Sequence, residues 1–207
     1  FRSNQKERIL DVIPLNEDGR TIVGDMDFSG SSLDVAVNAI IGSMLQNGYL
    51  NELANSVLIS VDNNDPVRGM ALQERLADEV NKLLQTDSFR GAVLSQTVVK
   101  SDELQQMAEQ YGITLGKAQL IQEILGKNSL HTFDELAPLS INELNILLGK
   151  EGAETHVEVV GTASEKGYIG ETKAKEIALA KAGVSESDLT FYTVGLDTHK
   201  GVMVYDV

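Results

Sequence analysis

Residues 57–61 read VLISV, residues 66–84 read PVRGMALQERLADEVNKLL, and residues 92–99 read AVLSQTVV. The first and third segments have the length and the β-branched content of buried strands. Between them, Asp65 and Pro66 are placed to begin a helix. Its apolar stripe consists of Leu72, Leu76, Val80, Leu83 and Leu84. The order strand, helix, strand predicts a crossover unit, although the sequence leaves open which strands pair.

Two further elements are predicted before this unit. The apolar run Ile9–Ile13 is followed by Pro14 and turn-forming residues 16–19, so we expect a hairpin whose second strand is Thr21–Val23. Apolar residues then recur at helical spacing, with Ser31 or Ser32 as the cap and Gly48 as the stop.

The residues after the crossover unit predict a group of helices. Ser101 and Thr114 are placed as helix caps. Residues 132–135 and 140–143 each match the capping-box pattern, in which a hydroxyl and a carboxylate bond the amides at a helix start. We therefore expect a helical subregion over residues 101–149, whose leucine and isoleucine stripes form a core rather than a groove for a partner helix.

Beyond residues 149–152 the pattern changes to strands. A strand is predicted at His156–Val160, a helix at Gly170–Ala182, and a hairpin formed by Leu189–Leu196 and Val202–Val207 around residues 197–201.

The whole pattern predicts an α+β fold in two domains. Residues 1–150 form a mixed sheet and helix domain that contains the helical subregion, and residues 151–207 place a helix on an antiparallel sheet. Phe1 is not an initiator residue, and Tyr205–Val207 would end inside a strand, so we expect the chain to be part of a longer protein.

Composition excludes several classes of function. The 31 acidic and 17 basic residues give a formal net charge of -14, which would repel nucleic acid. The longest apolar stretch, residues 39–45, falls far short of the ~20 residues that cross a bilayer. The chain has no cysteine, which excludes disulfides and thiolate metal sites. It also lacks tryptophan and has few aromatic residues, which disfavours a polysaccharide hydrolase.

Potential metal ligands have simpler structural explanations. The histidines are far apart and lack the spacing of zinc ligands: His131, His156 and His199. Residues 62–65 (DNND) carry oxygen donors but lack the glycine and distant glutamate of a calcium loop, and they suit a turn followed by a helix cap. We expect no metal and no cofactor.

No pattern of catalytic residues stands out either. Asp25 and Asp27 are interpreted as exposed strand residues rather than as a pair of carboxylates for acid–base chemistry. Ser60, Ser95 and Ser101 have no histidine near them in sequence. We therefore expect a binding or signalling protein and no enzyme.

The last fifty residues carry four short motifs, namely GYIG at 167–170, IAL at 177–179, AGV at 182–184 and VYDV at 204–207. Together they resemble a PepSY-type domain. The resemblance implies a helix that lies close against a curved antiparallel sheet, with Ala174, Ala178 and Ala182 on the packed side. PepSY domains occur in peptidase propeptides, membrane regulators and secreted proteins, so this resemblance alone does not define a function.

The preceding 150 residues carry five motifs in a fixed order: PLNEDG at 14–19, VLISV at 57–61, GAVLSQ at 91–96, YGITLGK at 111–117 and LSINEL at 139–144. They resemble the extracytoplasmic middle region of RsgI-like anti-sigma factors. With the PepSY-like segment, the resemblance covers nearly the entire chain.

This resemblance implies a single-pass membrane protein whose extracytoplasmic region includes this chain. In the family, a cytoplasmic domain holds an alternative sigma factor of the SigI type inactive. An Asn-Pro bond just upstream of the first strand breaks spontaneously, and the two pieces stay associated. The present sequence contains no Asn-Pro pair, and Phe1 lies where the family has the residues just after that bond.

From the residues we predict that Ile9, Leu10, Val12 and Ile13 pair with a strand of the upstream piece. Opening of this pairing would release the membrane-anchored piece to an intramembrane protease. The alternative is a secreted peptidase propeptide or protease inhibitor that contains a PepSY domain. The two differ in what precedes the chain, which is a membrane helix with a sigma-binding domain in the first case and a signal peptide in the second.

Overall fold

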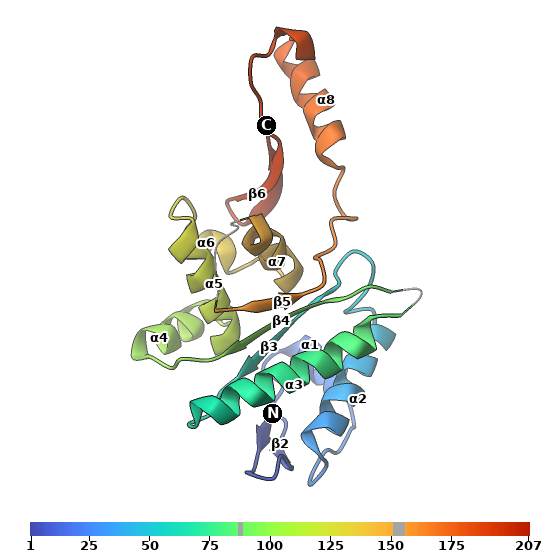
Figure 1. The fold of residues 1–207 in the computed structure, drawn as a ribbon, viewed down its shortest axis with the longest axis vertical. Helices are drawn as coiled ribbons and strands as arrows, with labels where there is room; N and C mark the ends of the chain where they lie inside the picture. The colour runs from blue at the N-terminus through green and yellow to red at the C-terminus, as the bar shows by residue number, and fades with distance from the viewer. Residues whose placement is uncertain (87–88, 151–155) are drawn as a thin grey trace. The chain divides into compact units, whose positions relative to one another are not determined.

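The computed structural model describes residues 1–86, 89–150 and 156–207, and its elements confirm the predicted α+β class (Figure 1). Contacts divide the chain into two compact units, each of which is described by itself below. Unit 1 comprises Phe1–Val99 and Glu158–Thr162, and unit 2 comprises Lys100–Val157 and Ala163–Val207.

Unit 1 contains a mixed sheet and the longest helix of the described residues. Its elements in chain order are β1 (Arg2–Ser3), β2 (Ile9–Asp11), α1 (Glu17–Val23), α2 (Leu33–Gln46), β3 (Ser56–Val61), α3 (Pro66–Leu84), β4 (Ala92–Thr97) and β5 (Glu158–Val160).

The predicted crossover unit is confirmed, and β3 and β4 are parallel. Their register runs from Ser56 opposite Ala92 to Val61 opposite Thr97. Helix α3 connects the two strands and is capped by the Asp65 side chain. Strand β5 pairs antiparallel with the other edge of β4, so the strand order is β3-β4-β5.

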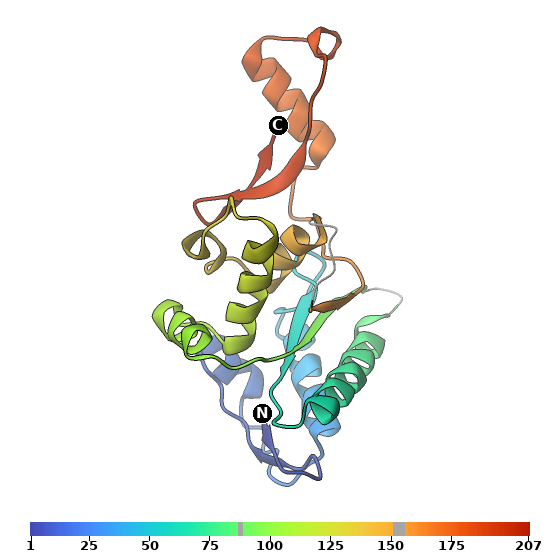
Figure 2. The same ribbon diagram turned by 60° about the vertical axis from the view of Figure 1, so that its left-hand side comes forward.

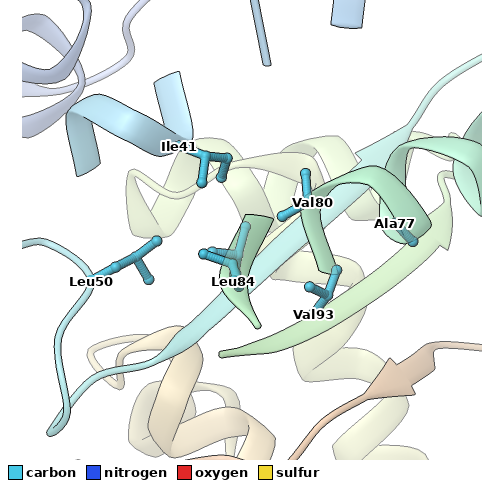
Figure 3. Close-up of a cluster of buried hydrophobic side chains, with 7 residues drawn as sticks. Ile41, Leu50, Ala77, Val80, Leu84 and Val93 are labelled. Atoms are coloured by element: carbon cyan, nitrogen blue, oxygen red, sulfur yellow. The ribbon is translucent and has the colours of Figure 1, made fainter. Parts of the chain in front are cut away.

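One apolar core lies between the sheet and helices α2 and α3. Figure 3 shows its side chains gathered between these elements. The buried members are Ile41, Leu50, Val57, Ala77, Val80, Leu84 and Val93. The packing of Leu84 leaves no room for a side chain at Gly91, because a Cβ there would lie 2.6 Å from Cβ of Leu84. This core holds the crossover helix onto the strands that it connects.

A second core attaches the beginning of the chain to the same helices. It contains Ile9 from β2 together with residues of α2, β3 and α3, namely Leu33, Ala36, Val61 and Leu76, and Phe28. Above it, the Arg75 guanidinium bonds the carboxylates of Glu7 and Asp34. Apolar burial and this three-residue ionic contact therefore fix the loop between β1 and β2 against α2 and α3.

The predicted second strand of the opening hairpin is wrong. Residues Thr21–Val23 end helix α1, which begins when Asn16 Oδ1 accepts the Gly19 amide at 2.8 Å. Glu17 and Asp18 lie in its first turn, where carboxylates are favourable beside free helix amides. Strand β2 instead pairs antiparallel with β1, which precedes it in the chain.

Unit 2 contains the predicted helical subregion. Its elements are α4 (Asp102–Tyr111), α5 (Leu115–Lys127), α6 (Phe133–Leu136), α7 (Ile141–Lys150), α8 (Glu171–Ala182), the short 3-10 helix η1 (Glu186–Asp188), β6 (Gly195–His199) and β7 (Val202–Asp206). The predicted caps are confirmed, because Ser101 and Thr114 begin α4 and α5 and both capping boxes are formed.

The β6–β7 hairpin is confirmed with a different turn. Its first strand begins at Gly195 rather than Leu189, and the predicted turn residues Asp197–His199 belong to β6. Lys200 and Gly201 both have positive φ, 52° and 76°, which is typical of a two-residue turn between twisted strands. The hairpin contacts α6 and α7 (Figure 2).

Polar contacts hold this hairpin against α6. The Lys200 amide donates to Glu135 at 3.3 Å, and His131 lies 3.1 Å from Asp197. The amides of Lys200 and Thr132 lower the pKa of the Glu135 carboxyl. In α8, Ala174 is buried, Ala178 is half-buried and Ala182 is exposed.

The strand predicted at His156–Val160 is present as β5, but it lies in the sheet of unit 1 and not at the start of a separate sheet. The predicted domain boundary between residues 150 and 151 borders residues 151–155, which lie outside the described part of the chain. The assignment of residues 151–207 to a PepSY-type domain stays a prediction.

Truncation of the core beneath α3 tests this packing. Leu84→Ala removes a fully buried side chain, and we expect the free energy of unfolding to fall by about 2–5 kcal/mol. Val67→Ala in the same helix is the matched control, because Val67 is 79% exposed and its loss should change stability by less than about 0.5 kcal/mol. Urea denaturation followed by circular dichroism measures both, and equal losses would contradict the packing.

Candidate strand-pairing site

The predicted pairing segment is anchored by two of its four side chains. Ile9 is 2% exposed in the second core of unit 1, and Val12 packs against the same core. Leu10 and Ile13 point to solvent, with exposed fractions of 59% and 52%. The segment is therefore held in an extended form while two large apolar side chains remain uncovered.

Backbone hydrogen bonds divide the segment into a closed and an open part. The Ile9 amide donates to the Ser31 carbonyl at 2.9 Å, and the Ile9 carbonyl accepts the Gly30 amide at 3.0 Å. β1 occupies the other side of β2. Among the described residues, neither Val12 nor Ile13 makes a backbone hydrogen bond. New strand pairing is therefore open at Val12–Ile13 and not at Ile9.

A second open edge belongs to β3, which is one of the two outer strands of the three-stranded sheet. The carbonyls of Asn55 and Val61 accept the amides of Ala92 and Val98. In β3, the backbone N–H and C=O groups of the odd-numbered residues therefore face β4. The backbone groups of Leu58 and Ser60 therefore point away from the sheet, and no hydrogen bond to them is found in the part of the chain that the structure describes.

The sequence of β3, SVLISV, carries none of the usual protection of an exposed edge. It has no charged residue, proline or glycine, whereas exposed edge strands commonly carry charges, prolines or bulges that discourage pairing with other chains. The length and composition of β3 thus favour a covered edge in the intact protein.

The residues considered for metal binding have local structural roles. Asp65 caps α3, and Asn63 Oδ1 accepts the Asp65 amide at 2.9 Å. His131 pairs with Asp197, as described above. Within residues 1–86, 89–150 and 156–207, no group of three or more histidine and carboxylate side chains is arranged to hold a metal ion.

Four of the five residues considered for catalysis make hydrogen bonds within the fold. Asp27 Oδ1 accepts the Ser29 amide at 2.9 Å, in the connection after α1 rather than in a strand. Ser60 and Ser95 each accept a hydrogen bond from a buried glutamine, and Ser101 caps α4. These contacts account for the hydroxyl groups as parts of the fold.

Side chains of the YGITLGK motif at residues 111–117 join α4 and α5 to the region of α6. Tyr111 donates to Asp134 at 2.6 Å, which links α4 to α6. Lys117 of α5 donates to the Ala137 carbonyl at the end of α6, at 2.8 Å. Burial raises the pKa of Tyr168 to about 12, with a further contribution from Glu143 of α7. These contacts stabilise the fold. The open strand edges at β3 and at Val12–Ile13 are the features that suit a binding partner.

The sequence of residues 1–123 matches the family described as the anti-sigma factor RsgI-like central domain. The chain belongs to the RsgI-like anti-sigma factor family. The resemblance inferred from the motifs is therefore confirmed over more than half of the chain.

A curated protein is also similar in sequence to this chain. The chain is 28% identical over 142 residues to the anti-sigma-I factor RsgI7 of Acetivibrio thermocellus. The aligned stretch covers 68% of this chain but 26% of the relative, so the chain spans about a quarter of that protein. Of the helices that the structure describes, none is both long and apolar enough to cross a membrane.

Sequence reasoning missed the open edge of β3 and the buried Asn55 beside it. β3 is apolar enough to be placed in a core, but strand order cannot be read from one sequence, so its position at the edge was not predictable. Asn55 precedes β3 directly, and a polar side chain at the start of an apolar strand is a signal that could have identified it.

Lys117 provides a test by pH. Burial lowers the pKa of its ammonium group below 10.5, opposed by Glu143. Below the folded-state pKa, Lys117 is protonated in both the folded and the unfolded protein, so folding must bury a charge. This cost in folding free energy disappears as the pH rises from the folded-state pKa toward 10.5. The stability of the wild type relative to Lys117→Met should therefore increase with pH over this range, measured by urea denaturation. A constant or falling difference would contradict the burial of the charge.

Proposed function

We propose that this chain is the extracytoplasmic signal-relay part of a membrane-spanning anti-sigma factor that controls an alternative sigma factor of the SigI type. Membership in the RsgI-like family carries this proposal. The relative from Acetivibrio thermocellus is named an anti-sigma-I factor and is much longer than this chain, which supports a role as one region of a larger protein.

In this proposal the chain binds the upstream piece of the same polypeptide without a covalent bond. An Asn-Pro cleavage upstream of Phe1 would produce that piece, and a sigma factor would be bound by its cytoplasmic domain. The chain itself is a binding element and not an enzyme. A protease within the membrane acts on the released piece.

The unpaired backbone at Val12–Ile13 supports the contact by strand addition. An added strand can satisfy these groups with hydrogen bonds and can cover the exposed Leu10 and Ile13 side chains at the same time. Both contributions are short-range, so mechanical or ligand-driven opening can separate the pieces without unfolding the whole of unit 1.

Co-purification tests the contact directly. The upstream segment, carrying an affinity tag, is co-expressed with this chain, and we expect both to elute together under native conditions. A double variant, Leu10→Asp with Ile13→Asp, should reduce recovery at least about tenfold, because each charge would be buried beneath the added strand. Leu53→Asp, which changes an equally exposed leucine elsewhere in unit 1, is the matched control.

A third variant distinguishes the two open edges. Leu58→Asp places a charge beside the outer edge of β3, and it should leave recovery unchanged if the upstream strand pairs at Val12–Ile13. Loss of recovery with Leu58→Asp alone would move the contact to β3. No recovery of the wild-type pair would reject strand addition by the upstream segment.

A further inference from the structure

Strand β5 reaches the sheet of unit 1 from a part of the chain that otherwise belongs to unit 2. The chain leaves unit 1 after Val99, returns for Glu158–Thr162 and leaves again at Ala163. Because the chain is continuous, the direct covalent path from the residues after Thr162 into unit 1 runs through β5.

β5 is also the weaker partner of β4. It contributes three residue pairs, and all three of its residues are exposed. The ladder of β4 with β3 has six pairs, and five of the six β4 residues are buried. Elements with few buried contacts open locally at lower free energy than the core. β5 can therefore leave while β3 and β4 stay paired.

A buried asparagine of unit 1 holds the segment that follows β5. Asn55, which is 5% exposed, donates from Nδ2 to the Thr162 carbonyl at 3.0 Å and to the Arg90 carbonyl at 2.7 Å. One side chain thus connects the start of β3, the second residue before β4 and the second residue after β5.

A second buried asparagine, in unit 2, holds the next residues of the same segment. Asn142 of α7, which is 4% exposed, donates to the Ser164 carbonyl at 2.8 Å and accepts the Ser164 amide at 3.2 Å. Ser164 lies two residues beyond Thr162. A load from the C-terminal side therefore meets the Asn142 contact before the Asn55 contact.

Backbone packing at Gly161 adds a further constraint next to β5. Gly161 has φ of +85°, and a Cβ at this position would lie 2.5 Å from the Gly91 carbonyl oxygen. The backbone at Gly161 lies so close to the backbone at Gly91 that only glycine fits. This close packing fixes the position of β5 in addition to its hydrogen bonds with β4.

We propose that β5 is a release strand, which detaches from β4 as the first step in unit 1 when residues after Thr162 are pulled. Asn142 and Asn55 set the order, since Ser164 must be freed before Thr162. Detachment opens the second edge of β4 and leaves β3 and β4 as a two-stranded pair. The place of this step in signalling rests on the proposed function, whereas the step itself is a property of this chain.

Residue-resolved hydrogen exchange by NMR on this chain tests the proposal. The amides of Val93 and Ser95 face β5, and those of Leu94 and Gln96 face β3. Asn55→Ala should speed exchange at Glu158 and at the two odd-numbered amides by about tenfold, since the variant loses the buried hydrogen bond that holds Thr162, two residues after β5. The even-numbered amides should exchange as in the wild type.

Asn142→Ala is the matched control. It removes an equally buried asparagine and should speed exchange at Ser164, while β5 stays as protected as in the wild type. The proposal is overturned if Asn55→Ala leaves β5 unchanged, if it accelerates odd and even amides of β4 alike, or if Asn142→Ala accelerates β5 equally.

A second variant keeps the test decisive if Asn55→Ala does not fold. Gly161→Ala disturbs the end of β5 without touching β3, and it should reproduce the alternating exchange pattern. Gly167→Ala is its control, because a Cβ at Gly167 would meet no atom within 4 Å. Unchanged exchange in Gly161→Ala would overturn the proposal. Neither experiment contains the upstream segment, so its outcome is independent of the co-purification result.

Discussion

A strand in a sheet has two hydrogen-bonding edges, and the fold of unit 1 is determined by how these edges are filled. β4 fills one edge with the parallel strand β3 and the other with β5, which arrives some sixty residues later in the chain. Because a buried backbone group without a partner is costly, β5 stabilises β4 in the centre of the sheet by bonding its second edge. Leu58 and Ser60 on the outer edge of β3, and Val12 and Ile13 after β2, are two places where no backbone hydrogen bond is found within the described residues.

Local signals allowed much of the fold to be predicted from the sequence. The apolar runs around residues 57–61 and 92–97, the Asp65-Pro66 helix start and the hydroxyl caps at Ser101 and Thr114 depend on near neighbours. The helix at Thr21–Val23 was mistaken for a strand because its three β-branched or apolar residues outweighed the cap at Asn16. A short segment of this kind is decided by its capping hydrogen bond and not by the propensity of its last turn.

The pairing of strands that are distant in the chain could not be predicted from a single sequence. The residues Glu158–Val160 were expected to form a strand, but nothing local indicates that they pair with Val93–Ser95. The same limit applies to the candidate site. The exposed Leu10 and Ile13 lie within the predicted segment, whereas the use of the Ile9 backbone by Gly30 and Ser31 depends on a turn twenty residues away. Asn55 and Asn142 gain their importance from contacts that cross more than twenty residues of sequence.

In an RsgI-like protein these features join two short strand contacts to one stable core. The upstream piece would be held at the open segment after β2, and the C-terminal region is joined to the sheet through β5. Between them lies the β3–α3–β4 core, whose large buried side chains resist opening. Such an arrangement lets a pull or a binding event change strand pairing while the core stays folded.

Intact-mass measurement of the full-length protein tests this account most directly. Purified under native conditions and then in denaturant, the protein should give two pieces divided just before Phe1 that remain together until the denaturant is added. A single undivided chain, or two pieces that separate without denaturant, would contradict the claim that this chain holds its upstream neighbour by strand pairing.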